Sequence, residues 1–435
     1  MKSNKNTIIL GAGLAGLSAA YHGNGIIFEK ESYVGGMCHS PKVKGFTFDY
    51  GIHVLHSKNA YVLKLLQEDL KVKLPTRSRQ AWIFSHGAYT RYPMQANTYG
   101  LPAHIIKRCL LDFIKVNNNK KIKFKNYKEW LLSAFGEGFA KSFLIPYSEK
   151  FWTVSARKMT TDWLDIRIPK PTLEEVIEGA LSDQTKGFGP NAIFRYPRGK
   201  QGIGKLPESF KKALASRSVP IFFNKEVIKV DTDNKKISFK DGASRNYLKL
   251  ISTIPLPELI KIIQPSPPPG VLRAAGALKY NSIICVNLAV KVENINSNHW
   301  IYYPEEDYCF FRISFLKNFS SGLVPKKMSS ITAEVSYSHN INLSKNDIAT
   351  KTIKDLIKAK IIHSANDVNF TDVRDIKYAY VIYDQKRKKN VNTIKKYLSK
   401  LNIFLAGRYG SWEYQWMDDA ILDGKRAIEQ ADTAK

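Results

Sequence analysis

Residues 7–16 of the chain read TIILGAGLAG, an apolar run followed by three glycines. The run Thr7 to Leu10 predicts a buried parallel strand, and Leu14 to Tyr21 predicts a helix that starts among the glycines. A second apolar run, Gly25 to Phe28, predicts another strand directly after the helix. The N-terminal segment therefore predicts a compact βαβ unit.

The three glycines have the spacing GxGxxG, and an acidic residue, Glu29, ends the second strand. Gly11 permits a tight turn, Gly13 lets a pyrophosphate approach the backbone, and Gly16 allows the helix to pack closely. The positive end of the helix attracts phosphates, and Glu29 would bond the ribose of an adenosine. Because strand, helix and acidic residue fall in register, we predict a dinucleotide site.

The composition is that of a globular chain with more than one core. Its 435 residues exceed the usual size of a single hydrophobic core, so two domains are expected, and they can be interleaved along the chain. The longest apolar runs are far below the roughly 20 residues of a membrane span. The first residues, Met1 to Lys5, enter a strand at once and leave no room for a signal peptide. We therefore expect a cytoplasmic protein without a transmembrane segment.

The four cysteines are scattered, with no CxxC pair and no histidine at ligand spacing, so neither a zinc site nor a disulfide framework is indicated. The net charge of +29 would favour an anionic partner, and it leaves peripheral contact with a membrane surface open. A general lysine-rich composition is the alternative, which the even spread of lysines favours. The one dense cluster, Lys386 to Lys389, lacks the interleaved aromatics of a nucleic-acid surface. We expect no nucleic-acid partner and no metal site.

The remaining chain divides into a helical stretch and several strands. Helical periodicity predicts four helices, at 61–69, 103–116, 127–135 and 173–181. Alternating or short apolar runs predict strands at 226–231, 236–239, 248–253, 282–290, 309–316, 329–337 and 402–406. A final helix is expected from about Asp419.

These elements predict an α/β fold: a Rossmann-type dinucleotide-binding domain with an inserted helical subdomain and an antiparallel-sheet substrate domain. The expected dinucleotide-binding domain is discontinuous and takes residues 1–60, 195–260 and 395–435. Residues 61–194 form the mainly helical cap region. Residues 261–394 form the sheet-containing substrate domain.

Two further segments distinguish FAD from a nicotinamide cofactor. A glycine pair, Gly35 and Gly36, is followed by FDYGIHVLH at residues 48–56. Near the end of the chain, residues 407–412 read GRYGSW and residues 417–419 read MDD. Together they resemble the flavoprotein superfamily of amine oxidases, protoporphyrinogen oxidases and UDP-galactopyranose mutases. The resemblance implies that the discontinuous dinucleotide-binding domain is a GR2-like FAD-binding domain.

That resemblance implies which residues meet the cofactor. Gly35 and Gly36 would approach the flavin pyrophosphate and ribityl chain, and Arg408 would meet phosphate. The backbone near Met417 and Asp418 would meet the ribityl chain or the flavin ring. Val227 completes the expected cofactor contacts. These assignments add to Gly11, Gly13, Gly16 and Glu29.

Within the superfamily, the chain is similar nearly end to end to UDP-galactopyranose mutases, especially their longer eukaryotic-type branch. Five blocks in the same order carry the similarity. They are YPMQAN at 92–97, FGPNAIFRYP at 188–197, WIYYPE at 300–305, FFR at 310–312 and GSWEY at 410–414. The spacing of five separate blocks is far more specific than the glycine motif alone.

The resemblance implies catalytic positions for His53, Arg167 and Arg312. His53 matches a histidine beside the flavin ring. Arg167 and Arg312 match two arginines that clamp the substrate diphosphate, a task suited to a planar guanidinium that can bond two oxygens at once. A satisfied core histidine and surface ion pairs are the alternatives for these residue types.

The resemblance also implies substrate-binding positions. Tyr92 and Gln95 match residues that hold a uracil ring, with a strand packing face as the alternative. Tyr380 and Tyr414 match tyrosines whose hydroxyls reach the diphosphate. Asn191 falls near the sugar, and Tyr302 is a further substrate contact.

Three positions depart from the family pattern. Phe319 stands where a phosphate-contacting tyrosine is expected, Ser148 stands where asparagine is expected near the sugar, and Ile52 replaces a small or cyclic residue beside His53. These departures leave room for a different sugar or a different reaction.

The leading functional hypothesis is an FAD-dependent mutase that interconverts the pyranose and furanose forms of a UDP-linked, or other NDP-linked, sugar for cell-surface glycan biosynthesis. The resemblance implies that N5 of reduced FAD forms the adduct with the sugar, and NAD(P)H is a candidate reductant. An FAD-dependent oxidoreductase of the amine oxidase or protoporphyrinogen oxidase type is the alternative. A flavin-bound interaction module without catalysis is the third.

Overall fold

The computed structural model describes residues 7–23, 25–117, 124–164, 167–184, 187–189, 192–338, 341 and 343–434. Its centre is a parallel sheet with the strand order β20-β13-β1-β2-β9. The strands are β1 (Thr7–Leu10), β2 (Ile26–Phe28), β9 (Ile221–Phe222), β13 (Lys249–Ser252) and β20 (Ile403–Leu405). The predicted βαβ unit and Rossmann-type sheet are therefore confirmed.

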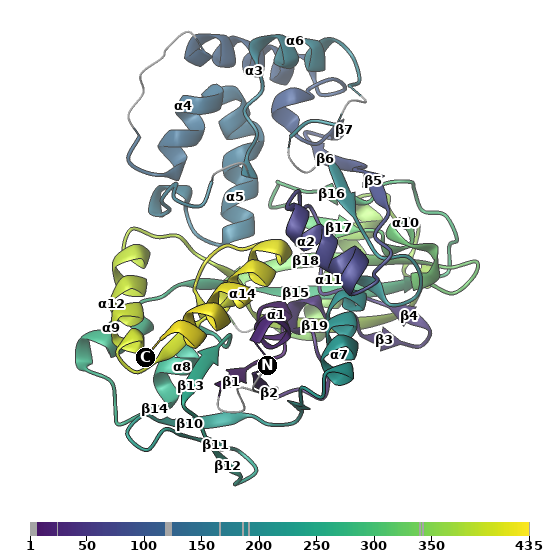
Figure 1. The fold of residues 1–435 in the computed structure, drawn as a ribbon. Helices are drawn as coiled ribbons and strands as arrows, with labels where there is room; N and C mark the ends of the chain where they lie inside the picture. The colour runs from purple at the N-terminus through teal and green to yellow at the C-terminus, as the bar shows by residue number, and fades with distance from the viewer. Residues whose placement is uncertain are drawn as a thin grey trace.

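Three helices pack around this sheet: α1 (Leu14–Gly23), α7 (Lys205–Ser216) and α14 (Met417–Thr433) (Figure 1). The helices α1 and α14 approach very closely. A Cβ atom built on Gly424 of α14 would lie 2.0 Å from the backbone oxygen of Ala15 in α1. A side chain at this position would clash with backbone, so glycine is what lets the two ends of the chain pack together.

A small four-stranded sheet lies beside the parallel one, with the order β12-β11-β10-β14. Its strands are β10 (Val227–Asp231), β11 (Lys236–Phe239), β12 (Ser244–Asn246) and β14 (Ile263–Gln264). The predicted strands at 226–231 and 236–239 belong here. The strand predicted at 248–253 instead joins the parallel sheet as β13.

The largest sheet has seven strands in the order β19-β15-β18-β17-β16-β6-β7. They are β6 (Ala81–Ser85), β7 (Ala88–Arg91), β15 (Tyr280–Val290), β16 (Trp300–Tyr302), β17 (Arg312–Ser314), β18 (Ser329–Ser338) and β19 (Val368–Val381). All neighbours are antiparallel except β16 and β6. The expected antiparallel sheet is confirmed, although the strand predicted at 309–316 is reduced to β17.

Alternation along β15 separates two hydrophobic cores. Ile283 and Cys285 belong to the main core, whereas Ile284 and Val286 belong to a second core that also contains Ile348 of helix α11 (Lys345–Lys358). Successive side chains of a strand point to opposite faces of its sheet. The sheet is therefore buried on both faces, which holds its strands rigidly beneath the site described below.

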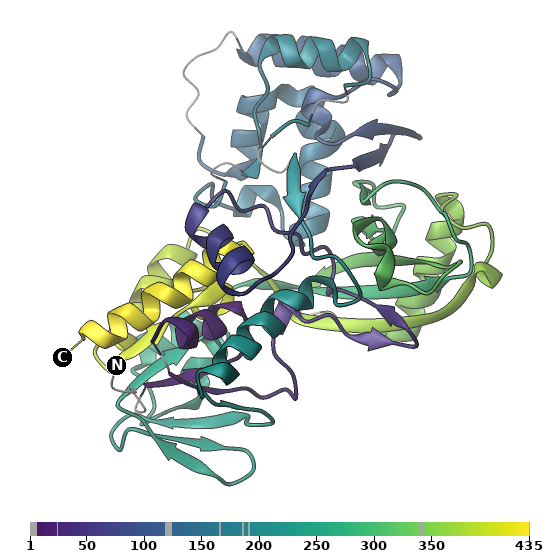
Figure 2. The same cartoon turned by 45° about the vertical axis from the view of Figure 1, so that its right-hand side comes forward.

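A group of helices lies at one end of the molecule, as Figures 1 and 2 both show. It contains α3 (Ala103–Asn117), α4 (Tyr127–Phe139), α5 (Ile145–Trp152) and α6 (Leu173–Leu181), while the shorter α2 (Ala60–Lys64) continues as a π-helical turn at Leu65–Asp69. The predicted helices at 103–116, 127–135 and 173–181 correspond to α3, α4 and α6. The same stretch of chain also supplies β6 and β7 to the large sheet, and β5 (Thr76–Ser78) to a pair with β8 (Ile193–Arg195). The proposed three-part domain division stays a prediction.

Short elements complete the described chain. They are the strands β3 (Lys42–Val43) and β4 (Phe46–Thr47), and the helices α8 (Leu256–Ile262), α9 (Pro269–Gly276), α10 (Leu316–Phe319), α12 (Arg387–Ser399) and α13 (Gly407–Gly410). None of the helices in the described ranges combines the length and apolarity needed to cross a membrane.

Candidate active site

The first glycine motif forms a tight turn between β1 and α1. Gly11 has a φ of +101°, and its N–H donates to the Phe28 oxygen at 2.9 Å. A Cβ at Gly16 would lie 2.0 Å from the Gly11 oxygen, whereas nothing lies within 4 Å of a Cβ built on Gly13. Gly11 and Gly16 thus make close contacts with their neighbours, and Gly13 leaves the backbone open. The open backbone lies at the positive end of a helix, as a pyrophosphate requires.

The second glycine pair lies against the first. Gly35 and Gly13 form a parallel bridge, and the Gly35 N–H donates to the Ala12 oxygen at 2.8 Å. Both Gly35 and Gly36 have positive φ values, of +119° and +53°. A Cβ at Gly36 would approach only the Gly13 Cα, at 3.6 Å. The two motifs, separate in sequence, therefore make one exposed backbone surface.

Glu29 closes this surface from the end of β2. Its carboxylate accepts hydrogen bonds from the backbone N–H of Ala12 at 2.6 Å and of Glu31 at 2.9 Å. Burial raises the pKa of Glu29 and these two hydrogen bonds oppose the rise. The predicted cofactor residue Val227 lies half-buried on the neighbouring β10.

The predicted C-terminal cofactor segment is organised by Asp423, which sequence reasoning missed. One oxygen of this buried carboxylate accepts from the Gly407 N–H at 2.9 Å, the Ser411 hydroxyl at 2.8 Å and the Gln415 amide at 2.8 Å. The Arg408 guanidinium donates from Nη2 to the backbone oxygen of Gln415, at 2.6 Å. Met417 and Asp418 then begin α14.

These residues fit FAD. Gly13 and Gly36 leave the backbone open at the positive end of α1, and Glu29 stands at the end of the strand where an adenosine ribose is expected. Arg408 brings a fixed positive charge from the opposite end of the chain. FAD would be held by Gly11, Gly13, Gly16, Glu29, Gly35, Gly36 and Arg408.

A cavity of about 230 Å³ lies next to this surface. Its walls come from the helical group, the seven-stranded sheet and the C-terminal segment. Ten predicted site residues line it: His53, Tyr92, Gln95, Arg167, Tyr302, Arg312, Tyr380, Arg408, Tyr414 and Met417. Asp418 does not line it, and Asn191 lies outside the described residues.

The charged side chains among the described lining residues of the cavity are all positive. Four arginines line the cavity, namely Arg79, Arg167, Arg312 and Arg408. Among the lining residues that the structure describes there is no aspartate or glutamate. Such a wall attracts anions and repels cations.

Arg312 is held by a carboxylate directly behind it. Arg312 on β17 faces Glu334 on β18 in register, and the two side chains form two hydrogen bonds, at 2.7 Å from Nε and 2.6 Å from Nη2. Glu334 is only 2% exposed and lines an adjoining small chamber. Burial alone would lower the pKa of Arg312, but the Glu334 charge outweighs it and raises the pKa. The guanidinium is therefore charged and fixed in orientation.

Arg167 is held by backbone oxygens and aromatic rings. Its guanidinium donates to the Trp163 oxygen at 3.1 Å and to the Tyr414 oxygen at 2.8 Å. It lies 4.8 Å from the centre of the Tyr414 ring and 5.2 Å from that of Trp416. Its Nε has no partner among the described residues, so the group retains a donor for a ligand.

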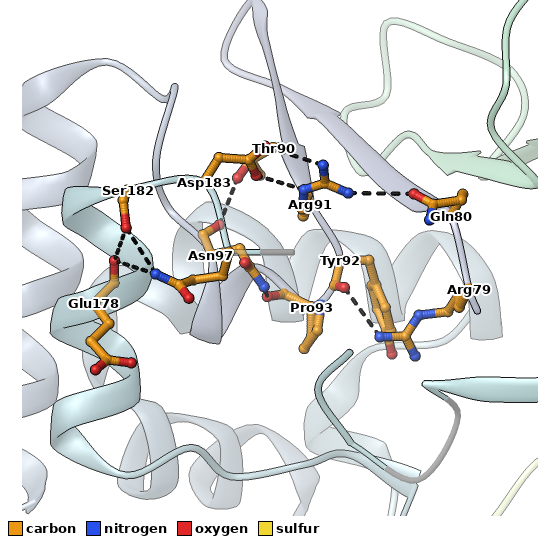
Figure 3. A network of polar contacts seen from close by, with 11 residues as sticks. Arg79, Gln80, Thr90, Arg91, Tyr92, Pro93, Asn97, Glu178, Ser182 and Asp183 are labelled. Carbon is orange, nitrogen blue, oxygen red and sulfur yellow. Dashed lines mark hydrogen bonds and ion pairs between the residues drawn. The ribbon is translucent and has the colours of Figure 1, made fainter. Parts of the chain in front are cut away.

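A hydrogen-bond network fixes the turn that carries Tyr92 and Gln95 (Figure 3). The Thr90 hydroxyl donates to the Asn97 oxygen at 2.6 Å, and the Asn97 amide donates to the Pro93 oxygen at 3.1 Å. Gln95 donates to the Pro169 oxygen at 2.9 Å, which leaves its Oε1 as a buried acceptor without a partner among the described residues.

Two aromatic rings stand together at this end of the cavity. The ring centres of Tyr92 and Tyr302 are 4.8 Å apart. The Arg79 guanidinium lies 4.8 Å from the centre of the Tyr92 ring and donates to the Tyr92 oxygen at 3.2 Å, as Figure 3 shows. Arg79 carries no sequence motif, and only its position in the fold identifies it as a lining residue.

Polar atoms without partners are concentrated around the cavity. Buried polar groups in folded proteins are almost always hydrogen-bonded. Among the described residues, five with such an atom line the cavity: His53, His56, Gln95, Arg167 and Trp300. This concentration indicates a site built to receive polar groups from a ligand.

His53 is neutral in the folded protein. Burial, and next the nearby charges of Arg408 and Arg312, lower its pKa to about 3. Its Nδ1 has no partner among the described residues. His53 thus presents an uncharged ring between two fixed cations.

Acidification is expected to destabilise the protein partly through His53. Because its folded pKa of about 3 lies below the ordinary 6.5, the unfolded chain binds a proton that the folded chain does not. His53 therefore does not change the free energy of unfolding well above pH 6.5. As the pH is lowered from about 6.5 to 3, its contribution reduces the free energy of unfolding by up to about 1.4 kcal/mol per pH unit. Denaturant unfolding between about pH 8 and 5 should show a shallower pH dependence for His53→Phe than for the wild type. Equal slopes would contradict the lowered pKa.

The three departures from the family pattern lie in different surroundings. Ser148 lines the cavity, and its hydroxyl is 2.9 Å from the Tyr127 hydroxyl. Ile52 also lines the cavity, next to His53. Phe319 is 1% exposed, packs against Tyr196 and Phe194, and is not a lining residue. Only the first two departures therefore alter the cavity wall.

Comparisons with known proteins agree with the fold predicted from the sequence. A family model described as flavin containing amine oxidoreductase matches residues 14–431. A crystal structure of reduced UDP-galactopyranose mutase is 27% identical, with a TM-score of 0.91 over 98% of this chain and 93% of the other.

Two further solved structures share the fold at lower identity. One is assigned as a protoporphyrinogen oxidase from Exiguobacterium sp. 255-15, with 16% identity and a TM-score of 0.75 over 98% of both chains. The other is a redesigned putrescine oxidase, with 14% identity and a TM-score of 0.68 over 99% of both chains.

Proposed function

We propose that this chain, which belongs to the family of flavin-containing amine oxidoreductases, binds FAD and acts on a sugar linked to a nucleoside diphosphate. The proposed reaction interconverts the pyranose and furanose forms of the sugar, as a step in cell-surface glycan biosynthesis. UDP is the proposed nucleotide. The likeness to a UDP-galactopyranose mutase at 27% identity supports this choice.

One observation carries the proposal: the cavity has four arginines and, among its described lining residues, no carboxylate. A diphosphate brings negative charge that such a wall stabilises. An amine substrate in its cationic form would be repelled by the same wall. The charge of the cavity therefore favours a nucleotide sugar over the amines that some family members oxidise.

The individual residues have matching proposed tasks. Arg167 and Arg312 would hold the diphosphate while its bond to the sugar breaks and forms again, because their charge is fixed in both directions. The Tyr380 and Tyr414 hydroxyls would add hydrogen bonds to it. Tyr92, Tyr302 and Gln95 would hold the base between rings and an amide acceptor. Asn191 would meet the sugar.

Reduced FAD, when bound, supplies a nucleophilic ring nitrogen, and oxidised FAD supplies a hydride acceptor. The chain's part is binding, orientation and charge. His53, which is neutral and whose Nδ1 has no partner among the described residues, would stand beside the flavin without adding a third positive charge. The aromatic walls would exclude water while the sugar is detached from its diphosphate.

The test is a turnover assay on the FAD-bound protein with UDP-galactopyranose, under anaerobic conditions. We expect furanose product only after the flavin is reduced by dithionite or NAD(P)H, with no net consumption of reductant. Stoichiometric reduction of the flavin by the substrate would instead support the oxidoreductase alternative. Fluorescence titration with UDP, CDP, ADP and GDP would check the nucleotide, and the tightest binding is expected for UDP.

A further inference from the structure

His56 lies on the wall of the cavity whose two parts the proposed function assigns to the base and to the diphosphate. Its ring centre is 5.8 Å from that of Trp416, and the Trp416 ring centre is 5.2 Å from the Arg167 guanidinium carbon. Arg79 lines the same cavity as His56 and lies over the Tyr92 ring, at the end assigned to the base. His56 thus shares one cavity wall with the base site and with the diphosphate clamp.

The His56 side chain has an unused polar atom. It lines the cavity, and its buried Nδ1 has no partner among the described residues. Burial, then the Arg79 charge, lower the pKa of His56 to about 4, although the Ile193 backbone and Asp418 oppose this. The ring is therefore neutral near pH 7, and one of its nitrogens needs a partner to offset the cost of burial.

A nucleoside diphosphate has its ribose between the base and the phosphates. We propose that His56 hydrogen-bonds a ribose hydroxyl of the substrate, so that a nucleotide lacking that hydroxyl binds more weakly. This inference rests on the proposed function, because it needs a nucleotide in the cavity.

The chemistry of both partners fits. A hydroxyl can donate and accept, so a neutral imidazole can bond it in either tautomer. A histidine ring is also flat enough to pack against Trp416 while presenting a nitrogen to the ligand. Gln95 and Arg167 retain their own unpaired atoms, Oε1 and Nε, for the base and the diphosphate on either side.

The experiment measures binding of UDP, 2′-deoxy-UDP and 3′-deoxy-UDP to the FAD-bound protein by titration calorimetry. The wild type should bind UDP roughly threefold to tenfold more tightly than at least one of the two deoxy forms, the usual range for one neutral hydrogen bond. His56→Phe should bind UDP more weakly than the wild type by about the same factor, and it should bind UDP and the deoxy forms equally. His56→Asn, which keeps a polar atom near Nδ1, should retain part of it.

The outcomes separate the two proposals. Equal binding of UDP and both deoxy forms by the wild type would overturn the role of His56. This comparison uses the wild type alone, so it holds even if a variant fails to fold. A ribose preference that survives in a folded, FAD-bound His56→Phe would overturn it as well. If the wild type binds no nucleoside diphosphate at all, the proposed function fails first and takes the inference with it.

Discussion

Replacing Arg312 with alanine is expected to abolish measurable binding of the nucleotide sugar and to destabilise the fold at the same time. Binding should fall because one arm of the proposed diphosphate clamp is removed. Stability should fall because Glu334, at 2% exposure, loses the partner of both its hydrogen bonds. Breaking a buried ion pair by removing one side costs about 3–5 kcal/mol. Denaturant unfolding and UDP titration measure the two effects separately.

A double variant separates charge from packing. Arg312→Met with Glu334→Leu removes both charges and replaces the buried pair with apolar side chains of similar size, so most of the lost stability should return. Binding of UDP should not return, because no guanidinium faces the cavity. Tight UDP binding by the double variant would remove Arg312 from the clamp. A single Arg312→Ala variant as stable as the wild type would contradict the buried pairing itself.

Asp423→Ala is expected to weaken FAD binding by on the order of a hundredfold. The carboxylate accepts hydrogen bonds from Gly407, Ser411 and Gln415. Each buried donor left without a partner costs the folded segment about 1–3 kcal/mol, so bound FAD would have to order the segment, and a hundredfold loss corresponds to an ordering cost of about 2.8 kcal/mol. The segment that carries Arg408 would lose its fixed shape. FAD content after gel filtration and FAD titration of the stripped protein measure the loss.

Ser411→Ala is the matched control for Asp423→Ala, since it removes one donor and leaves the carboxylate with its other partners. It should weaken FAD binding by less than about tenfold. If Asp423→Ala retains FAD as well as Ser411→Ala does, the carboxylate does not organise the cofactor segment.

The parts of the fold that the sequence predicts well are those with strong local signals. The helix α6 begins where Thr172 and Glu175 form a reciprocal capping box, and its predicted bounds match those observed. The βαβ unit is likewise set by three glycines whose spacing has a steric reason. Such features depend on neighbours a few residues away, which a sequence displays directly.

The missed elements depend on distant partners. The strand β19 is half-exposed along most of its length and becomes a strand by pairing with β15, far away in the chain. The helix α12 is largely polar, and only Val391, Ile394 and Leu398 are buried. Neither segment has an apolar pattern strong enough to identify it without its neighbours.

The candidate site shows the same division. A family pattern marks Arg167 and Arg312, so the sequence predicts them as site residues. The carboxylates that hold functional groups in place are not predicted. Glu334 faces Arg312 only through the register of β17 and β18, and Asp423 reaches back from α14 to Gly407. A carboxylate acquires such a role from the three-dimensional arrangement, and its sequence neighbours carry no sign of it.

The order of strands in the parallel sheet has a consequence for biosynthesis. β1 is synthesised well before β13, which is one of its two neighbours, and β13 is synthesised well before β20, its own second neighbour. Pairings between such distant segments form slowly because long loops must close first. During translation the edge of β1 that pairs with β13, and later the edge of β13 that pairs with β20, therefore stay unpaired, and unpaired strand edges favour aggregation.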